Sequence, residues 1–448
     1  MLVVSGCAAP AKPPVVGAAS AEERVPFGPD LRAAEVRALL ATIRDGYSHL
    51  EEKKAAWGLD LAALEARYAP LARRAERWDQ YELVMVSLVS EFHDAHMAWR
   101  RVRAAGERKR RIARLGLSTR FVGETLLVSE VWKGAGADRA GLAVGDRIVA
   151  IDGQDVEARF KDHAALRSWS RIEDARHDFA DDWPASRYEV GEAAPVRQVG
   201  RAATGGAVET LAIPSETERP ADHPRERLAI TRRGAVTLVR IPSLGELGAP
   251  KKLDEIIAAV DADPRGLAID LRDDAGGYEY LARALVSHLV AHPIVAGEVR
   301  VRLTPQSRAE HGEWHDLAPD TSRPGWSAPQ PVRAEARAKR DYPARIAVLV
   351  DAGCRSSCET AALLLRAAGA RLFGERTGGS SGAPVAYTLP WSHAKVTVPA
   401  WRMSDAKGAE IEGVGVAPDE EIAWTREDLV AARDPVLDAA LRWLAPTP

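Results

Sequence analysis

A serine at the junction of a strand and a helix is the first residue of this sequence whose setting could support chemistry. Ser356 and Ser357 follow the apolar run 346–350 after a short turn, and an Ala/Leu-rich helix is predicted to begin beside them, with Glu359 in its first turn. A serine on such a turn lies next to helix N–H groups and the positive end of the helix dipole, which can stabilise an oxyanion. The alternative is an ordinary serine N-cap with an acidic residue in the first turn.

Two neighbouring glycines provide a second candidate site element. Gly276 and Gly277 follow the apolar stretch 266–272, GLAIDLR, and open another predicted helix. Consecutive glycines let backbone N–H groups approach a ligand closely. The alternative is a simple strand-to-helix turn.

Two further segments carry ionisable residues. The stretch 91–97, EFHDAHM, contains His96 and closes a predicted amphipathic helix, where a histidine can act simply as a cap that suits the dipole. The turn-rich stretch 410–419, EIEGVGVAPD, contains Glu412. The alternative to a functional role is that this stretch is simply an edge loop.

The elements that must position these residues fall into three types. Helical periodicity over 31–50, 59–78 and 81–96 predicts an antiparallel helical cap. From about residue 227 onward, apolar strands alternate with helices, which indicates a sheet covered on both faces. The segment 300–343 has no clear period and is predicted to be a surface excursion.

The region from about 114 to 220 has short strands and tight turns: alternating apolar residues predict strands over 125–131 and 147–151, and Asp152-Gly153 predicts a hairpin turn. Its segment 140–156, AGLAVGDRIVAIDGQDV, closely resembles a PDZ domain in the circularly permuted form of bacterial proteases. That resemblance implies capture of an extended peptide by strand addition, with the free carboxylate held by backbone N–H groups. The matching loop is formed by Leu115, Gly116 and Leu117.

The order of these motifs resembles the C-terminal processing peptidases and their tricorn-core relatives, over about residues 30–425. Those proteins are serine endopeptidases with a crotonase-like core. The resemblance implies that Ser356 is the nucleophile, and that Gly276 or Gly277 and the Ser357 N–H group form the oxyanion hole. No metal or organic cofactor is implied.

The general base departs from the pattern of the processing peptidases. They place a lysine in a GExTxGK stretch, whereas this sequence reads GERTGGSSG with Ser380 at that position. Tricorn relatives use a histidine from the N-terminal part, assisted by a serine and a glutamate. His96 and Glu412 match that histidine and glutamate.

The orienting group for His96 is left open. Ala95 replaces the serine that precedes the family's histidine, so Asp94 or a water would have to orient the ring. His393 is an alternative base, because it lies in the C-terminal core. These departures keep a rival interpretation open, in which the chain binds peptides without turning them over. A second rival is an interaction scaffold in which the helical cap docks a partner.

Composition limits the class of protein. A chain of 448 residues with 46% hydrophobic and 28% charged residues predicts a soluble protein of two or three domains. The net charge of −3 argues against nucleic acid as a partner. The one basic run, 106–116, is interpreted as a solvated interdomain face.

The cysteines bear on the cellular compartment. Val4-Ser5-Gly6-Cys7 resembles a bacterial lipoprotein signal, which predicts a lipid anchor at Cys7 in the periplasm. The six residues before Cys7 are short for such a leader, which favours a start lying upstream, and the alternative is an accidental match in a disordered apolar N-terminus. In an oxidising envelope Cys354 and Cys358 could form a disulfide, but they are one helical turn apart, a spacing that rarely suits one, so buried packing without a disulfide is favoured for Cys358. Zinc is not expected, because no CxxC or HxxxH pair is nearby.

The sequence therefore predicts a multidomain α+β protein with a helical N-terminal cap, a PDZ-like β domain and a crotonase-like α/β catalytic core. Its expected function is that of a cell-envelope serine endopeptidase, acting through an acyl-enzyme on protein or peptide substrates, with C-terminal tails recognised by the PDZ domain. The predicted segments are a leader and tether over 1–27, the cap over 28–113, the PDZ-like domain with an insertion over 114–222, and the core over 223–448.

Overall fold

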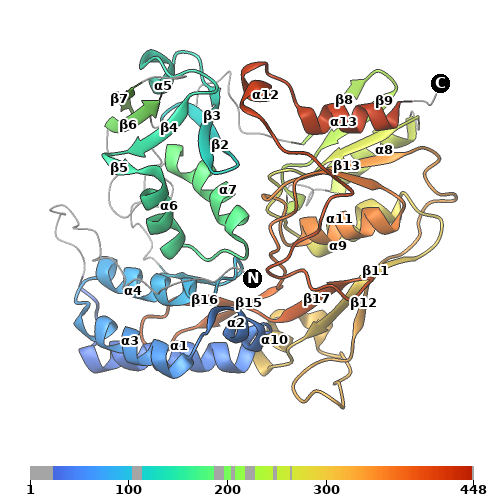
Figure 1. Ribbon diagram of the computed structural model, residues 1–448. Coiled ribbons are helices and arrows are strands. Elements are labelled where there is room, and N and C mark those ends of the chain that lie inside the picture. Colours follow the sequence, from blue (N-terminus) through green and yellow to red (C-terminus); the bar gives the residue numbers. More distant parts are fainter. Residues whose placement is uncertain are drawn as a thin grey trace.

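The computed structural model describes residues 24–102, 114–185, 196–202, 207–216, 228–245, 250–262 and 265–445. The predicted leader with Cys7 and most of the basic run, residues 106–113, lie outside these ranges. In Figure 1 the chain forms a blue helical unit, a teal and green β unit, and a yellow-to-red α/β unit. The predicted α+β class therefore describes the architecture.

The helical cap contains four helices that pack around one apolar cluster. Their bounds are α1 Pro29–Gly46, α2 Leu50–Trp57, α3 Leu61–Arg74 and α4 Trp78–Ser90. Strands far along the chain complete this cluster, because Val396 and Val398 pack with Leu39 and Ile43. Figure 1 accordingly shows β15 (Pro384–Thr388) and β16 (Lys395–Pro399) beside the blue helices.

The segment 91–97 is not helical, which corrects the predicted helix end. Helix α4 ends at Ser90, and His93 then adopts a positive φ of 47°. The Asp94 carboxylate accepts the His96 N–H at 2.9 Å, a local side-chain bond that competes with helical backbone bonding. The chain continues as β1 (Ala98–Arg100), which pairs with β16 so that Trp99 lies opposite Val396.

The PDZ-like unit is a sheet of order β2-β3-β4-β6-β7, with β5 beside β4. The bounds of β3 and β4 are those predicted, and Asp152 and Gly153 turn with positive φ between β4 and β5. The elements of this unit are β2 Leu117–Val122, β3 Thr125–Val131, α5 Gly136–Arg139, β4 Arg147–Ile151, β5 Gln154–Asp155, α6 Val156–Ala165, α7 Ile172–Asp182, η1 Trp183–Ala185, β6 Val196–Ala202 and β7 Val208–Pro214.

Helix α7 lies along β2, the edge strand of this sheet (Figure 1). The Thr119 hydroxyl donates to the Ala180 carbonyl at 2.6 Å, and the Trp183 indole N–H donates to the same hydroxyl at 3.0 Å. Apolar rings complete the contact, since Phe121 faces both Phe160 and Phe179. Helix α7 is thereby fixed to the PDZ-like unit by one of its faces.

The core is built on a six-stranded sheet of order β18-β14-β13-β10-β9-β8, parallel except at β8. Alternate residues of β13 belong to different clusters: Val348 packs with α9 and α11, and Leu349 packs with α13. The sheet is therefore covered on both faces, as its continuous apolar strands predict. Its elements are β8 Ala229–Arg233, β9 Val236–Arg240, α8 Pro250–Ala262, β10 Leu267–Asp270, α9 Glu279–Ser287, β13 Ile346–Val350, α11 Ser357–Ala367, β14 Arg371–Gly374, β18 Glu420–Glu421, α12 Arg426–Val430 and α13 Pro435–Leu444.

The segment 300–343 contributes to the core, which corrects its prediction as a surface excursion. Strand β12 (Gln330–Ala334) pairs with β11 (Ile294–Val301), and β17 (Trp401–Asp405) lies on the other side of β11. Val332 and Ala334 point inward from β12 and are fully buried. Their spacing of two is a strand pattern too short to stand out in a Pro- and Arg-rich stretch. The segment also contains α10 Pro305–Glu310 and η3 Gly312–Trp314.

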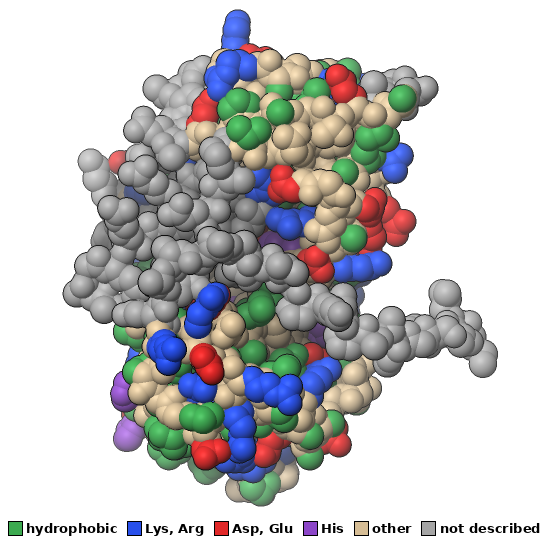
Figure 2. All heavy atoms as spheres, turned by 90° about the vertical axis from the view of Figure 1, so that its left-hand side faces the viewer, with side chains coloured by type: hydrophobic (Ala, Val, Ile, Leu, Met, Phe, Trp, Pro, Cys, Tyr) green, Lys and Arg blue, Asp and Glu red, His purple; other side chains and the backbone are tan. Residues whose placement is uncertain are grey.

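On the described part of the face drawn in Figure 2, Lys and Arg side chains are interspersed with acidic ones. Among the described residues, none of the helices has the length and apolar character to cross a membrane.

Candidate active site

Ser356 lies on a sharp turn between β13 and α11. Its backbone has φ 56° and ψ −125°, which only a strongly constrained non-glycine residue adopts, and its side chain makes no capping bond to the helix. The N–H of Ser356 donates to the Ser380 carbonyl at 2.9 Å. This geometry differs from that of an ordinary serine N-cap, and it leaves the hydroxyl available for reaction at the N-terminus of α11.

A disulfide joins Cys354 to Cys358 across this turn, which corrects the prediction of a buried free thiol. The two Cα atoms are 5.4 Å apart, within the range that a disulfide spans. The prediction assumed that both residues lie on one helix. In the structure α11 begins only at Ser357, so Cys354 belongs to the preceding turn and can approach Cys358 from outside the helix.

The glycine pair lies directly against the nucleophile turn. A Cβ added to Gly276 would come within 2.8 Å of Ser356 Cβ and 3.1 Å of the Ser357 nitrogen, so only glycine permits this approach. The Gly276 N–H already donates to Asp274 at 2.8 Å. Within the described residues, the N–H groups of Gly277 and Ser357 have no protein acceptor, which leaves these two as the free donors beside Ser356.

His96 reaches the same loop from the helical cap. Its Nδ1 lies 3.0 Å from the Ser380 hydroxyl, and its carbonyl accepts a bond from Thr397 of β16 at 2.8 Å. Gly382 makes room for the ring, because an added Cβ would meet His96 Nδ1 at 3.2 Å and Pro399 at 2.7 Å. The pairing of β1 with β16 therefore brings His96 to residues that lie almost 300 positions away in the sequence.

Ser380 is the residue whose role the sequence did not reveal. Its hydroxyl contacts His96, its carbonyl accepts the Ser356 N–H, and its own N–H donates to Glu359 at 2.9 Å. It therefore supplies the hydroxyl that Ala95 cannot offer to the histidine. The available signal was a serine at the position where the processing peptidases carry a catalytic lysine.

The ionisation of His96 suits a base. Burial lowers the pKa of the imidazole below 6.5 and the nearby Arg355 adds to this, while Asp94 acts in the opposite direction. Asp94 Oδ1 is 4.0 Å from Nδ1, and Asp94 Oδ2 accepts the Tyr47 hydroxyl at 2.8 Å. At neutral pH the ring is therefore unprotonated and can accept a proton.

Glu359 fixes the loop that carries Ser380. Its carboxylate accepts bonds from the Thr377 hydroxyl and from the N–H groups of Gly379 and Ser380. Burial raises the pKa of Glu359 to about 8, against the effect of these donors. The glutamate three residues after the nucleophile therefore positions the neighbouring loop, and it is fully buried.

Glu412 also contacts this loop, but through the residue after Ser380. One carboxylate oxygen accepts the Ser381 N–H at 2.9 Å, and the other lies 2.7 Å from Lys53 Nζ in a buried ion pair. Burial and the nearby Asp94 raise the pKa of Glu412, whereas the pairing with Lys53 lowers it. Within the described residues no hydrogen bond joins Glu412 to His96, so Asp94 and Ser380 are the closer groups to the ring.

The alternative base, His393, lies elsewhere. It is exposed on the turn between β15 and β16, and the N–H of neighbouring Ser392 donates to Glu35 of the cap. The structure therefore brings His96, and not His393, to the Ser380 loop.

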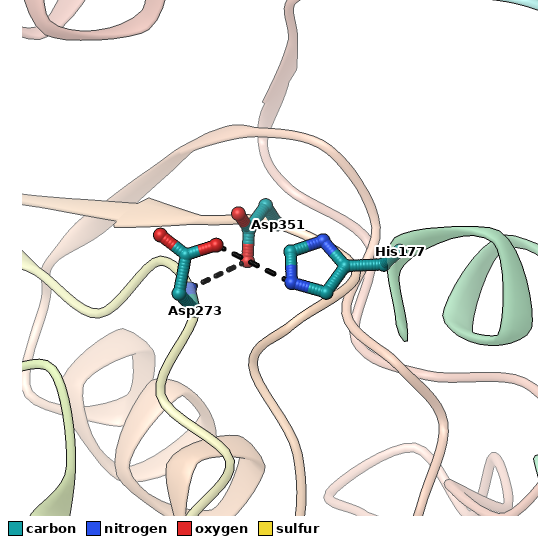
Figure 3. A group of neighbouring side chains, drawn as sticks. All are labelled: His177, Asp273 and Asp351. Carbon is teal, nitrogen blue, oxygen red and sulfur yellow. Dashed lines mark hydrogen bonds and ion pairs between the residues drawn. The ribbon is translucent and has the colours of Figure 1, made fainter. Parts of the chain in front are cut away.

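Helix α7 connects the PDZ-like unit to two turns of the core, the turn after β10 and the turn after β13. Arg355, next to Ser356, pairs with Asp174 at 2.5 Å and with Asp178 at 2.6 Å. His177 of α7 lies 3.3 Å from Asp273, whose N–H donates to Asp351 at 3.0 Å (Figure 3). These contacts hold the turn after β10 and the turn after β13 against the same helix.

The cluster of His177, Asp273 and Asp351 offers three ligand atoms within 4.8 Å of one another. Burial lowers the pKa of His177, but the bond to Asp273 and the Asp351 carboxylate outweigh it and raise the pKa to about 9. Arg240 also pairs with Asp273 at 2.9 Å. A protonated His177 and Arg240 therefore both offset the charge of the Asp273 carboxylate.

Several backbone groups of the predicted peptide-binding loop already form hydrogen bonds within the protein. The Leu115 N–H donates to the Pro184 carbonyl at 2.9 Å, and the Gly116 carbonyl accepts from Trp132 at 2.8 Å. The side chains of Leu115 and Leu117 are buried. Within the described part of the chain, the Gly116 N–H has no protein acceptor and remains a candidate donor to a carboxylate.

Comparison with known proteins agrees with this geometry. Residues 235–422 match the model of peptidase family S41, and residues 127–167 match that of the PDZ domain. No curated protein sequence matches the chain. The match to the S41 family model identifies a serine-type peptidase. The chain is accordingly a serine-type peptidase with an S41 peptidase domain and a PDZ domain, whose substrates are proteins or peptides.

Solved structures show the same fold over nearly the whole chain. Mature CPAF complexed with lactacystin superposes with a TM-score of 0.71 at 13% identity, covering 93% of this chain and 98% of that one. A putative peptidase from Parabacteroides merdae gives a TM-score of 0.53 at 16% identity, covering 93% and 98%. The photosystem II D1 C-terminal processing protease gives 0.50 at 18% identity, covering 93% and 97%. At these identities the likeness concerns the fold alone.

Proposed function

We propose that this chain is a serine endopeptidase of the cell envelope that cleaves peptide bonds through an acyl-enzyme on Ser356. The observation that carries the proposal is the link through Ser380, whose carbonyl accepts the Ser356 N–H and whose hydroxyl contacts His96. Through this one residue, the nucleophile of the core and the histidine of the cap occupy a single site.

The proposed reaction begins with proton transfer. When His96 Nδ1 carries the ring proton it donates to the Ser380 hydroxyl, and Nε2 is left to take the proton of Ser356. The Ser356 oxygen then attacks the peptide carbonyl, and the Gly277 and Ser357 N–H groups stabilise the oxyanion. His96 returns the proton to the leaving amine, and water hydrolyses the acyl-enzyme by the same route.

Ser356→Ala and His96→Ala are each expected to lower kcat/KM by about 10³-fold or more, because either change removes one member of a hydrolytic unit. The double variant should be little worse than either single variant. Labelling by a fluorophosphonate probe, read by mass spectrometry of the tryptic peptide containing Ser356, identifies the nucleophile directly. A folded wild-type protein that takes up no label and cleaves no peptide would instead support the peptide-binding alternative.

The PDZ domain is proposed to recognise the C-terminal tail of the substrate. The free Gly116 N–H and the positive φ of that residue support this, since such a loop can receive a carboxylate. The test compares one labelled peptide with a free carboxylate and the same peptide with an amidated C-terminus, by fluorescence anisotropy against the Ser356→Ala protein. Equal affinity for the two peptides contradicts recognition of the terminus.

The proposed location is the periplasmic side of a bacterial envelope, with a lipid anchor at Cys7. The motif Val4-Ser5-Gly6-Cys7 supports the anchor, and the Cys354–Cys358 disulfide supports an oxidising compartment. Mass spectrometry of the N-terminal peptide of the protein isolated from its native cells tests the anchor. An unlipidated Cys7 in the membrane-free fraction contradicts it.

A further inference from the structure

The disulfide between Cys354 and Cys358 spans the three residues Arg355, Ser356 and Ser357. Two of these carry the proposed chemistry, since Ser356 is the nucleophile and the Ser357 N–H is an oxyanion donor. The disulfide itself has no part in the proton transfers described above. Its position nevertheless encloses the reacting serine on both sides.

The enclosed turn needs external support. Ser356 has a positive φ of 56°, a conformation that persists only where the surrounding structure holds it. Its backbone is held by the N–H bond to Ser380, and the Cys354 carbonyl accepts the Gly378 N–H at 2.9 Å. The disulfide adds a covalent connection between the turn at Cys354 and the first helical turn at Cys358.

The disulfide is better placed to fix local geometry than to stabilise the whole fold. It joins residues only four positions apart, and the loss of unfolded-chain entropy grows with the length of the closed loop. Both cysteines have no exposed surface and lie in the main apolar cluster of the core. A reductant cannot reach them in the folded protein, so a rapidly reversible switch is excluded.

We propose that the Cys354–Cys358 disulfide is a positioning brace for the catalytic turn, required for full turnover and dispensable for folding. The proposal rests on Ser356 being the nucleophile. Without the brace, Ser356 and the Ser357 N–H relax from their reactive arrangement, and a displacement of about 1 Å at a reacting group can cost about 10²-fold in rate. The peptidase then reaches full activity only after it has folded in an oxidising environment.

Formation of the brace is a two-electron oxidation. The two thiols lose two protons and two electrons as the S–S bond forms, and a disulfide such as oxidised glutathione accepts them and becomes two thiols. Exchange proceeds through a mixed disulfide, so it must occur before the turn is buried.

The first test compares Cys354→Ala, Cys358→Ala and the double variant with the wild type. Active-site titration with a fluorophosphonate counts competent serines, so that kcat is obtained per titrated site. We expect kcat per site to fall by about 10- to 100-fold with KM little changed, and the double variant to match the singles. The thermal unfolding midpoint should stay near that of the wild type. Cys7→Ser is the matched control, because it removes a cysteine outside the brace, and it should leave kcat unchanged.

The second test avoids substitutions. Wild-type chain is unfolded, reduced and refolded with or without oxidised glutathione, and mass spectrometry distinguishes the two forms by two hydrogens. Recovery of kcat per site only in the oxidised form supports the brace. Full turnover of the reduced form, or its failure to fold, overturns a positioning role. If the oxidised wild type itself shows neither labelling nor turnover, the proposed function fails instead.

Discussion

At the scale of single residues, the proposed site depends on one residue, Ser380, that makes contacts in three directions. Ser380 joins His96, Ser356 and Glu359, and each bond leaves from a different group of the same residue. Only the bond to His96 uses the hydroxyl, so substitution by alanine removes that bond and leaves the backbone contacts in place. Ser380 is therefore a positioning residue whose contribution can be measured separately.

Ser380→Ala should lower kcat/KM by about tenfold, which corresponds to the loss of about one net hydrogen bond to the ring. The pH profile should change as well, because His96 Nδ1 loses its partner. Ser381→Ala is the matched control, since its buried hydroxyl has no hydrogen-bond partner among the described residues. Equal losses in the two variants would show that the loop, and not the hydroxyl, matters.

The pH dependence of the reaction follows from the burial of His96. Burial lowers its pKa below 6.5, and the base works only in the unprotonated form. The acid limb of kcat/KM should therefore rise with pH through a midpoint below 6.5 and be flat at neutral pH. Asp94→Asn should move this midpoint lower still, because it removes the carboxylate that raises the pKa. A midpoint above 6.5 contradicts this assignment.

At the scale of elements, strand β1 and helix α7 assemble the site from outside the core. Strand β1 pairs with β16 and places His96, while α7 holds the turns that carry Arg355 and Asp273. One face of α7 is fixed to β2, and the other carries Asp174, His177 and Asp178 towards the core. Helix α7 therefore connects the PDZ-like unit to the two turns that carry Arg355 and Asp273.

The contact of His177 with Asp273 should make stability depend on pH. The folded-state pKa of His177 is raised to about 9, above its unfolded value of 6.5. Its stabilising contribution is therefore fully present below pH 6.5 and is lost as pH rises towards about 9. Because the pair is partly exposed, we expect a contribution of about 1–2 kcal/mol. His177→Gln should lose this dependence in urea unfolding measured across the same range, and an unchanged pH slope contradicts the assignment.

At the scale of the whole molecule, the cap, the PDZ domain and the core each supply a part of one site. The cap provides His96 and Lys53, the core provides Ser356 and Ser380, and helix α7, which packs on the PDZ-like unit, provides the acidic partners of Arg355. Removal of the PDZ domain should therefore alter catalysis as well as substrate capture.

Deletion of residues 114–220 should lower kcat/KM for a short peptide by about tenfold or more, because Arg355 loses both partners beside the nucleophile. The Asp174→Asn/Asp178→Asn double variant should reproduce this loss in the intact chain. Asp162→Asn is the control, since among the described residues its exposed carboxylate accepts a bond from Gln154 alone. Unchanged kinetics on short and long substrates in both altered proteins would show that the domains act independently.

The sequence by itself determined the local elements and most of the residue types of the site. Alternation and apolar runs predicted β3, β4 and β13 because these patterns depend on neighbours a few residues away. The motif around Ser356 likewise predicted a strand-to-helix turn. The structure contains this turn, in which Ser356 adopts a positive φ and Gly276 lies close to it.

Only the tertiary structure decided how these parts meet. Periodicity extended a helix through His96, whereas the helix ends at Ser90, the Asp94 carboxylate accepts the His96 N–H, and the following strand pairs with β16. The roles of Ser380 and Lys53, and the Cys354–Cys358 bond, depend on where the chain folds back upon itself. Such contacts join residues far apart in sequence, or across a turn whose shape the packing sets, and local pattern carries no information about them.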